Sequence, residues 1–189
     1  MTDYARMPLA EARADYLAHT TAAMPIGGLV SWGVFALLLA TVPAALPWWL
    51  ALTVGAIPVP LALAIDKARG NMAAWSAGND NPIAQLFFRT IALVTFLVPL
   101  VLGAYQASGN LDLLILGMAI LSGVVWISHG WGADDPAGFT HFILRSIACY
   151  AAYMLAPEEW RGAAIAGAVA LSYVQAIAMM KKPGKARAA

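Results

Sequence analysis

Apolar residues occupy long, nearly uninterrupted stretches of the chain, and short groups of polar residues separate these stretches. Residues 20–50, for example, include no charged side chain. A helix on the surface of a soluble protein shows a polar face at every turn, whereas about 18 or more successive apolar residues are typical of a helix that crosses a membrane. The pattern therefore predicts helices that are surrounded by lipid.

Proline, glycine and charged residues divide the apolar stretches into six predicted spanning helices. They cover about Ala22–Thr41, Trp48–Ile65, Ile83–Tyr105, Leu111–Ser128, Phe139–Leu155 and Gly162–Met180. Before them, Leu9–His19 mixes charged and apolar residues behind Pro8, which predicts a short interfacial helix. We expect an all-α, polytopic transmembrane helix bundle that forms a single domain over residues 1–189.

Two features interrupt this pattern more strongly than the others. Gly70–Pro82 and His129–Gly138 are polar and rich in turn residues, so we expect two loops on the same side of the bundle. Pro58 and Pro60 remove two backbone donors near the middle of the second helix, which predicts a kink. Such a kink is used to line binding cavities in transporters and is also common in purely structural spanning helices, and both interpretations stay open.

Composition supports the membrane interpretation and excludes two other classes. Hydrophobic residues make up 61% of the chain and charged residues 11%, compared with about 25% charged residues in a soluble domain. The net charge of +1 and the lack of a basic patch argue against nucleic-acid binding. Cys149 is the single cysteine, so the chain has neither an internal disulfide nor a cysteine-based metal site.

Basic residues are distributed unequally between the two sides of the predicted bundle. One side carries only Arg161. The other side carries Arg6, Arg13, Lys67, Arg69, Arg89, Arg145, Lys181, Lys182, Lys185 and Arg187, with Arg89 and Arg145 just inside its boundary. Because positively charged connections stay in the cytoplasm, we expect a multi-pass protein of the bacterial inner membrane with both termini cytoplasmic.

Polar residues at helical spacing mark a candidate site in the cytoplasmic half of the bundle. Residues three or four positions apart share a helix face, and ionisable residues inside a membrane usually belong to a site or pathway. The candidate ligand-binding residues are Gln85, Arg89, Trp126, His129, His141 and Arg145. Two arginines and two imidazoles favour a small anion or a lipid headgroup, which the protein would bind or transport.

A structural role for the two arginines is the alternative interpretation of this pattern. Arg89 and Arg145 are close enough to the helix ends for their side chains to reach the lipid headgroups. They could also pair with Asp66, Asp80 or Asp135. In that case the polar residues would stabilise the bundle without binding a ligand.

A metal site and an enzyme are less favoured by the sequence. His129, Asp134, Asp135 and His141 are residue types that bind zinc or iron, but their spacing matches no established motif. Asp135 in front of Pro136 equally predicts a helix cap. The chain has no phosphate loop, dinucleotide fingerprint or nucleophile elbow. We expect no enzyme activity, no cofactor and no bound metal, and keep a metalloenzyme as a third hypothesis.

The sixth predicted helix has a face of small residues, which allows another helix to approach closely. These residues are Gly162, Ala163, Ala166, Gly167 and Ala170. The face could pack within the chain or against a second copy. It supports the second hypothesis, a structural or accessory subunit of a membrane complex or a homo-oligomer formed through this helix.

Several motifs resemble an uncharacterised family of small bacterial multi-pass membrane proteins. The resemblance covers about the C-terminal two-thirds of the chain. It rests on the segments Asn81–Ala84, Trp126–Trp131, Gly138–Arg145 and Ala156–Glu158 and on Arg161. Some relatives have His-Pro where this chain has Asp135-Pro136, which argues against a metal role for that loop. The family has no assigned activity, so the resemblance implies an architecture and no function.

Overall fold

A computed structural model describes residues 3–72, 75 and 80–182. These residues form helices and turns and contain no strand, which confirms the all-helical class. The α-helices are α1 (Leu9–Ala18), α2 (Ala23–Thr41), α3 (Trp49–Ala56), α4 (Pro58–Ala68), α6 (Pro82–Ser108), α7 (Leu111–Gly132), α8 (Pro136–Leu155) and α9 (Arg161–Met179). Two short 3₁₀ helices are η1 (Pro43–Ala45) and η2 (Glu158–Trp160). Part of the predicted loop Gly70–Pro82, together with Lys185 and Arg187, lies outside the described residues.

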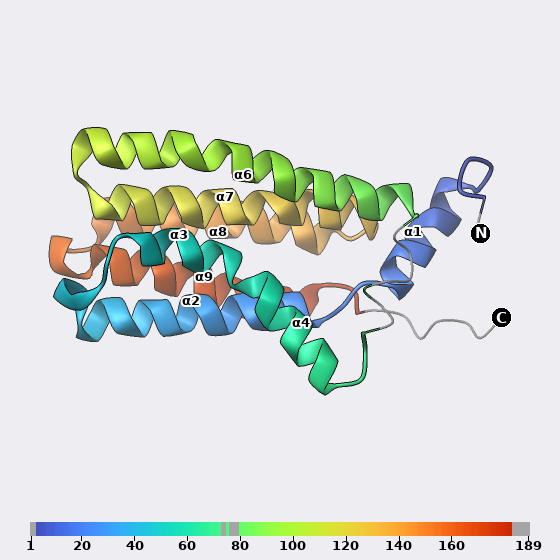
Figure 1. The fold of residues 1–189 in the computed structure, drawn as a ribbon, viewed down its shortest axis with the longest axis horizontal. Helices are drawn as coiled ribbons and strands as arrows, with labels where there is room; N and C mark the ends of the chain where they lie inside the picture. Colours follow the sequence, from blue (N-terminus) through green and yellow to red (C-terminus); the bar gives the residue numbers. More distant parts are fainter. Residues whose placement is uncertain (1–2, 73–74, 76–79, 183–189) are drawn as a thin grey trace.

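The long helices lie side by side along the longest axis of the molecule (Figure 1). α2 packs against α9, and α8 packs against both α7 and α9. α6 lies at one edge of the bundle, where it packs along α7 and meets α1 at its start. α1 sits at the end of the bundle where α6 begins, and the short helices η1 and η2 lie in turns at the opposite end.

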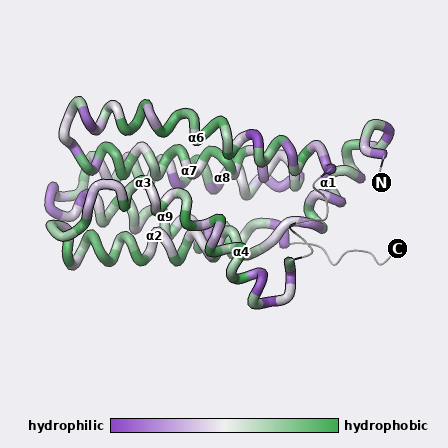
Figure 2. The backbone as a smooth tube through the Cα atoms, in the orientation of Figure 1, coloured by the Kyte–Doolittle hydropathy of each residue, from purple (hydrophilic) through white to green (hydrophobic). Residues whose placement is uncertain are grey.

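Within the part of the chain that the structure describes, four helical segments are long and apolar enough to cross a membrane. They are Ala23–Thr41, Pro82–Ser108, Leu111–Gly132 and Glu158–Met179, and α3 with α4 passes as one bent span. α8 does not pass this test of length and composition, so the count of six spans stays a prediction. Hydrophobic residues follow the length of the bundle and hydrophilic residues gather toward its ends (Figure 2), which is compatible with contact to a lipid bilayer.

The predicted kink at Pro58 and Pro60 is confirmed. α3 ends at Ala56, α4 begins at Pro58, and the two helices are bent by 41°. The physical reason is that neither proline can donate a helical hydrogen bond to the preceding turn. α2 packs directly on this bend, because a Cβ atom at Gly27 would lie only 2.8 Å from the carbonyl oxygen of Pro58.

The predicted loop His129–Gly138 is wrong in its extent. α7 continues to Gly132 and α8 begins at Pro136, so His129 lies in the last turn of a helix. The two helices approach closely at Gly130 and Gly138, where a Cβ atom on Gly138 would lie 2.7 Å from Cα of Gly130. The predicted cap is confirmed, since the Asp135 side chain accepts a hydrogen bond from the amide of Ala137 at 3.0 Å.

The small-residue face of α9 is used in part within the chain. Ala166 is fully buried, and Ala170 lies 4.0 Å from the position of a Cβ atom on Gly33 of α2. Gly162 packs close to Asp112. In contrast, a Cβ atom on Gly167 would meet no described atom within 4 Å. Close packing against α2 therefore accounts for much of this face, and Gly167 lies in open space.

Candidate functional site

Arg145 is a fully buried cation in the core of the bundle. Its guanidinium donates hydrogen bonds to the Tyr173 hydroxyl at 3.2 Å and to Ser122 Oγ, and it lies 5.6 Å from the centroid of the Trp32 ring. Among the described residues it forms no ion pair with a carboxylate. Arg145 thus neither reaches the headgroups nor pairs with Asp66, Asp80 or Asp135. Its charge is held by hydroxyl groups and aromatic faces from α7, α9 and α2.

Aromatic rings join Arg145 to the other residues predicted on α7 and α8. Trp126 lies between the two imidazoles, with ring centroids 5.5 Å from His129 and 5.3 Å from His141. His141 is fully buried and packs on Tyr173 at 5.2 Å. Nδ1 of His141 donates to the carbonyl oxygen of Ser172 at 2.9 Å. The structure therefore brings together four of the six predicted site residues.

Gln85 and Arg89 lie apart from this cluster. Both side chains are exposed on α6. Neither belongs to the described lining of the two cavities at the site. The face that these residues share on α6 is thus different from the face that meets the cavities.

The first cavity has a volume of about 220 Å³ and lies at the end of the bundle that carries α1. Its wall includes Trp126 and His129, and its basic lining residues are His19, His129, Lys181 and Lys182. No Asp or Glu is present in the lining that the structure describes. The start of α2 and the residues before it also border this cavity, through Thr20, Thr21, Ala22, Met24, Pro25 and Ile26. The cavity therefore combines basic side chains with the positive end of a helix dipole.

The second cavity has a volume of about 500 Å³ and lies between α6, α7 and the bent pair α3 and α4. Its lining is mainly apolar, with side chains such as Leu52, Val94, Val98, Met118 and Leu121. Ser122 and Tyr173, the two hydroxyl partners of Arg145, also line it. The two cavities adjoin, because Met24, Val59, Ile91 and Trp126 belong to both linings.

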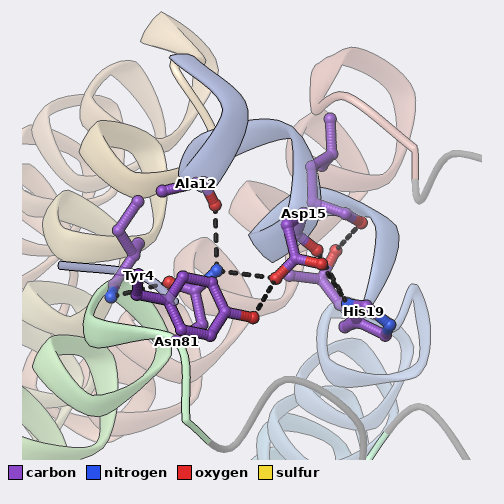
Figure 3. Close-up of polar contacts among 8 residues, drawn as sticks. Tyr4, Ala12, Asp15, His19 and Asn81 are labelled. Atoms are coloured by element: carbon purple, nitrogen blue, oxygen red, sulfur yellow. Dashed lines mark hydrogen bonds and ion pairs between the residues drawn. The ribbon is translucent and has the colours of Figure 1, made fainter. Parts of the chain in front are cut away.

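A cluster of hydrogen bonds joins α1 to the start of α6 (Figure 3). Nδ2 of Asn81 donates to the carbonyl oxygen of Ala12 and to Oδ2 of Asp15, both at 2.9 Å. The hydroxyl of Tyr4 donates to the same Asp15 oxygen at 2.7 Å. Oδ1 of Asn81 caps α6 by accepting from the amide of Ile83 at 2.9 Å. The sequence does not predict this cluster, because the Asn81-Pro82 pair indicates only a helix cap.

Side chains of α1 and the residues that follow α9 contact the turn between α7 and α8, where the ammonium group of Lys181 donates to the carbonyl oxygens of Ala133 and Asp134. Arg13 forms an ion pair with Asp134 at 3.1 Å and lies 4.8 Å from the centroid of the Trp131 ring. The amide of Lys181 donates to Oδ2 of Asp135 at 2.6 Å. Of the residues in these contacts, Lys181 also lines the first cavity.

The four residues of the metalloenzyme hypothesis do not converge. Asp134 pairs with Arg13, Asp135 caps α8, and His141 is turned toward α9. Within the described ranges, no group of three or more His, Cys, Asp or Glu side chains could hold a metal ion.

A model of a family of unknown function, DUF7010, matches residues 9–182. The chain belongs to the DUF7010 family. The match runs from the first residue of α1 to Lys182, so it contains the complete described linings of both cavities. Membership confirms the resemblance to an uncharacterised family and assigns no activity to DUF7010. Comparison with curated proteins and with solved structures gives no match.

Proposed function

We propose that this DUF7010 protein is a multi-pass protein of the bacterial cytoplasmic membrane that binds an anionic group in the first cavity. The group is a phosphate or a carboxylate, carried either by a lipid headgroup or by a small solute. It enters from the cytoplasmic side, where both termini lie.

The packing and the length of α8 support its placement in the membrane, which gives six spans. α8 packs between α7 and α9, and its 20 residues correspond to about 30 Å, the thickness of the hydrocarbon core. His141 and Arg145, which lower its overall hydropathy, are fully buried. Its exposed side chains include Ile147, Met154 and Leu155, which suit lipid. With six spans, both ends of the chain lie on the side rich in Lys and Arg, which is cytoplasmic by charge.

The observation that carries the binding proposal is the one-sided charge of the first cavity. Lys181 and Lys182 stand at its edge, while the described lining contains no acidic residue. The start of α2 adds the partial positive charge of a helix N-terminus. Basic side chains and a helix N-terminus together favour a phosphate or carboxylate over a cation or a neutral group.

The six candidate residues take different roles in this proposal. Trp126 and His129 contact the ligand from the cavity wall. His141 and Arg145 hold Trp126 and Tyr173 in place from behind. Gln85 and Arg89 are exposed on α6, about 10 Å or less from its start, where their side chains reach the headgroup layer.

Binding is tested by native mass spectrometry of the detergent-solubilised protein. The probes are phosphatidylglycerol, which is anionic, phosphatidylcholine, which is zwitterionic, and inorganic phosphate. We expect saturable binding of an anionic probe, and a loss of affinity of about tenfold in Lys182→Glu, equivalent to about 1.4 kcal/mol. Lys67→Glu makes the same charge change on exposed Lys67 of α4, away from the cavity lining, and should bind like the wild type.

Two results would contradict the proposal. One is the absence of saturable binding for both anionic probes. The other is an equal loss of affinity in Lys182→Glu and Lys67→Glu, which would show that the overall charge of the protein governs binding and the cavity does not.

A structural or accessory role in a membrane complex is the second candidate. It is favoured by the outer face of α6, where Phe96 is 81% exposed and Leu100 73%, and by the open space at Gly167 on α9. Gly167→Leu should then abolish an assembly that is seen by cross-linking in membranes, while Lys182→Glu leaves it intact. An unchanged cross-linking pattern in Gly167→Leu would argue against a contact through α9.

A further inference from the structure

We infer that the ligand of the first cavity is a phospholipid with an anionic headgroup, and that one of its acyl chains lies in the second cavity. This inference rests on the proposed function, since it takes the first cavity as the site of the anionic group. It adds the chemical class of the ligand and the path of its hydrocarbon chain.

The two cavities form one continuous surface along α6. α6 contributes Ala84, Phe87, Phe88 and Ile91 to the first cavity and Ile91, Val94, Thr95 and Val98 to the second. These positions recur three or four residues apart, so they form a single stripe on one helix face. From Ala84 to Val98 the stripe extends for about 21 Å, which is about two-thirds of the hydrocarbon thickness of a bilayer. An acyl chain parallel to the bundle axis fits a surface of this length.

The cavity lining changes from charged to apolar along this stripe, as a phospholipid does from its headgroup to its acyl chains. The charged residues Lys181 and Lys182 belong to the first cavity only. The second cavity is lined mainly by aliphatic side chains, and its volume of about 500 Å³ lies within the range of about 300–1,000 Å³ for ligand pockets. The charged part of the surface is at the end of the bundle and the apolar part is deeper, which matches a headgroup followed by a chain.

The position of α6 gives a lipid access from the side. α6 packs along α7 and meets α1 at its start, and Ile83 is its single buried residue in the described structure. The bent pair α3 and α4 forms the opposite wall of the second cavity, with Gly55, Ala56 and Pro58 in its lining. The kink at Pro58 therefore shapes one wall of the cavity that would hold the acyl chain. The opposite, apolar wall belongs to α6, which lies at the edge of the bundle.

A chain-length series tests this inference in the wild-type protein by native mass spectrometry. The probes are long-chain phosphatidylglycerol, short-chain phosphatidylglycerol and glycerophosphate, which share the phosphate and differ in hydrocarbon. We expect the long-chain lipid to bind at least about tenfold more tightly than the short-chain lipid, and glycerophosphate to bind most weakly. Equal affinity for all three would overturn the inference and leave the proposed anion site standing. Binding of none of them would overturn both.

A matched pair of substitutions on α6 locates the chain. Val94→Trp places a large side chain in the second cavity, while Leu93→Trp changes a neighbouring side chain that is 66% exposed and belongs to neither lining. We expect Val94→Trp to lower the affinity for the long-chain lipid about tenfold and to leave the affinity for glycerophosphate unchanged. Leu93→Trp should bind like the wild type. Unchanged long-chain binding in a folded Val94→Trp protein would overturn the inference, and the wild-type series decides it if this variant does not fold.

Discussion

Tyr16 of α1 contacts His129 of α7, with the phenol oxygen 2.9 Å from Nδ1 of the imidazole. Burial raises the pKa of the Tyr16 phenol, so the hydroxyl keeps its proton and donates a hydrogen bond to Nδ1. Both residues line the first cavity. This hydrogen bond therefore joins the helix at the end of the bundle to the wall of the proposed binding site.

Tyr16→Phe should lower the free energy of unfolding by about 1 kcal/mol at neutral pH, because it removes this hydrogen bond. Because the pKa of Tyr16 is higher in the folded state than in the unfolded state, the phenol ionises first in the unfolded protein. The wild type therefore keeps its full stability below the unfolded pKa of about 10 and loses stability as the pH rises further. The stability difference between the wild type and Tyr16→Phe should therefore shrink above pH of about 10. Thermal unfolding in detergent at several pH values measures it.

Tyr150→Phe is the control for this prediction, because the Tyr150 side chain is 53% exposed on α8. It should change the free energy of unfolding at neutral pH by less than about 0.5 kcal/mol. An equal effect of the two substitutions would show that the contact with His129 contributes nothing specific.

Gly138→Ala should destabilise the protein by about 1–3 kcal/mol, the range for forcing extra atoms into a packed core. A Cβ atom there would lie 2.6 Å from the carbonyl oxygen of Trp126 and 2.7 Å from Cα of Gly130, and these backbone atoms cannot move without separating α7 from α8. Gly167→Ala is the matched control, since its Cβ atom would meet no described atom within 4 Å. Alanine favours a helix more than glycine does, so this variant should be as stable as the wild type or more stable. A Gly138→Ala protein that is more stable to thermal unfolding than Gly167→Ala would contradict the close approach of α7 and α8.

Asn81→Ala should lower stability more than Asn110→Ala, although both remove a helix cap that contributes about 0.5–2 kcal/mol. Asn110 caps α7 by accepting from the amide of Leu113, and its Nδ2 donates one longer hydrogen bond, of 3.3 Å, to the Tyr153 hydroxyl of α8. Asn81 caps α6 and also donates to Ala12 and Asp15 of α1. Hydrogen exchange of the α1 amides should accelerate in Asn81→Ala and stay unchanged in Asn110→Ala. Equal exchange in both variants would show that α1 is held by other contacts.

Arg145→Met and Tyr173→Phe should show a coupling energy of about 1.5–3 kcal/mol in a double-mutant cycle, as expected for a hydrogen bond from a charged donor. The guanidinium is fully buried, and its bond to the Tyr173 hydroxyl joins α8 to α9. Unfolding free energies of the wild type and the three variants give the coupling. Arg89→Met serves as the control, and its exposed side chain should change stability by less than about 0.5 kcal/mol. A coupling energy near zero would show that the hydrogen bond between Arg145 and Tyr173 does not stabilise the fold.

Helix positions, the kink at Pro58 and the cap at Asp135 were predictable from the sequence. Each depends on a few neighbouring residues: the length of an apolar run, the missing amide hydrogen of proline, and an acidic side chain before a helix start. The helix boundary near His129 was not predictable in this way. α7 continues to Gly132 because Gly130 and Gly138 let α8 come close, and this contact joins residues of two different helices.

The two arginines show most clearly what the tertiary structure decided. Arg89-Thr-Ile-Ala on α6 and Arg145-Ser-Ile-Ala on α8 have nearly the same local sequence, so the sequence by itself placed both at a polar site near a helix start. Arg145 is fully buried because α8 packs between α7 and α9, whose Ser122 and Tyr173 accept its hydrogen bonds. Arg89 is exposed because α6 lies at the edge of the bundle with α7 as its long neighbour. Local residues determined that a helix carries an arginine, and the number of helices packed around it determined whether that arginine is buried.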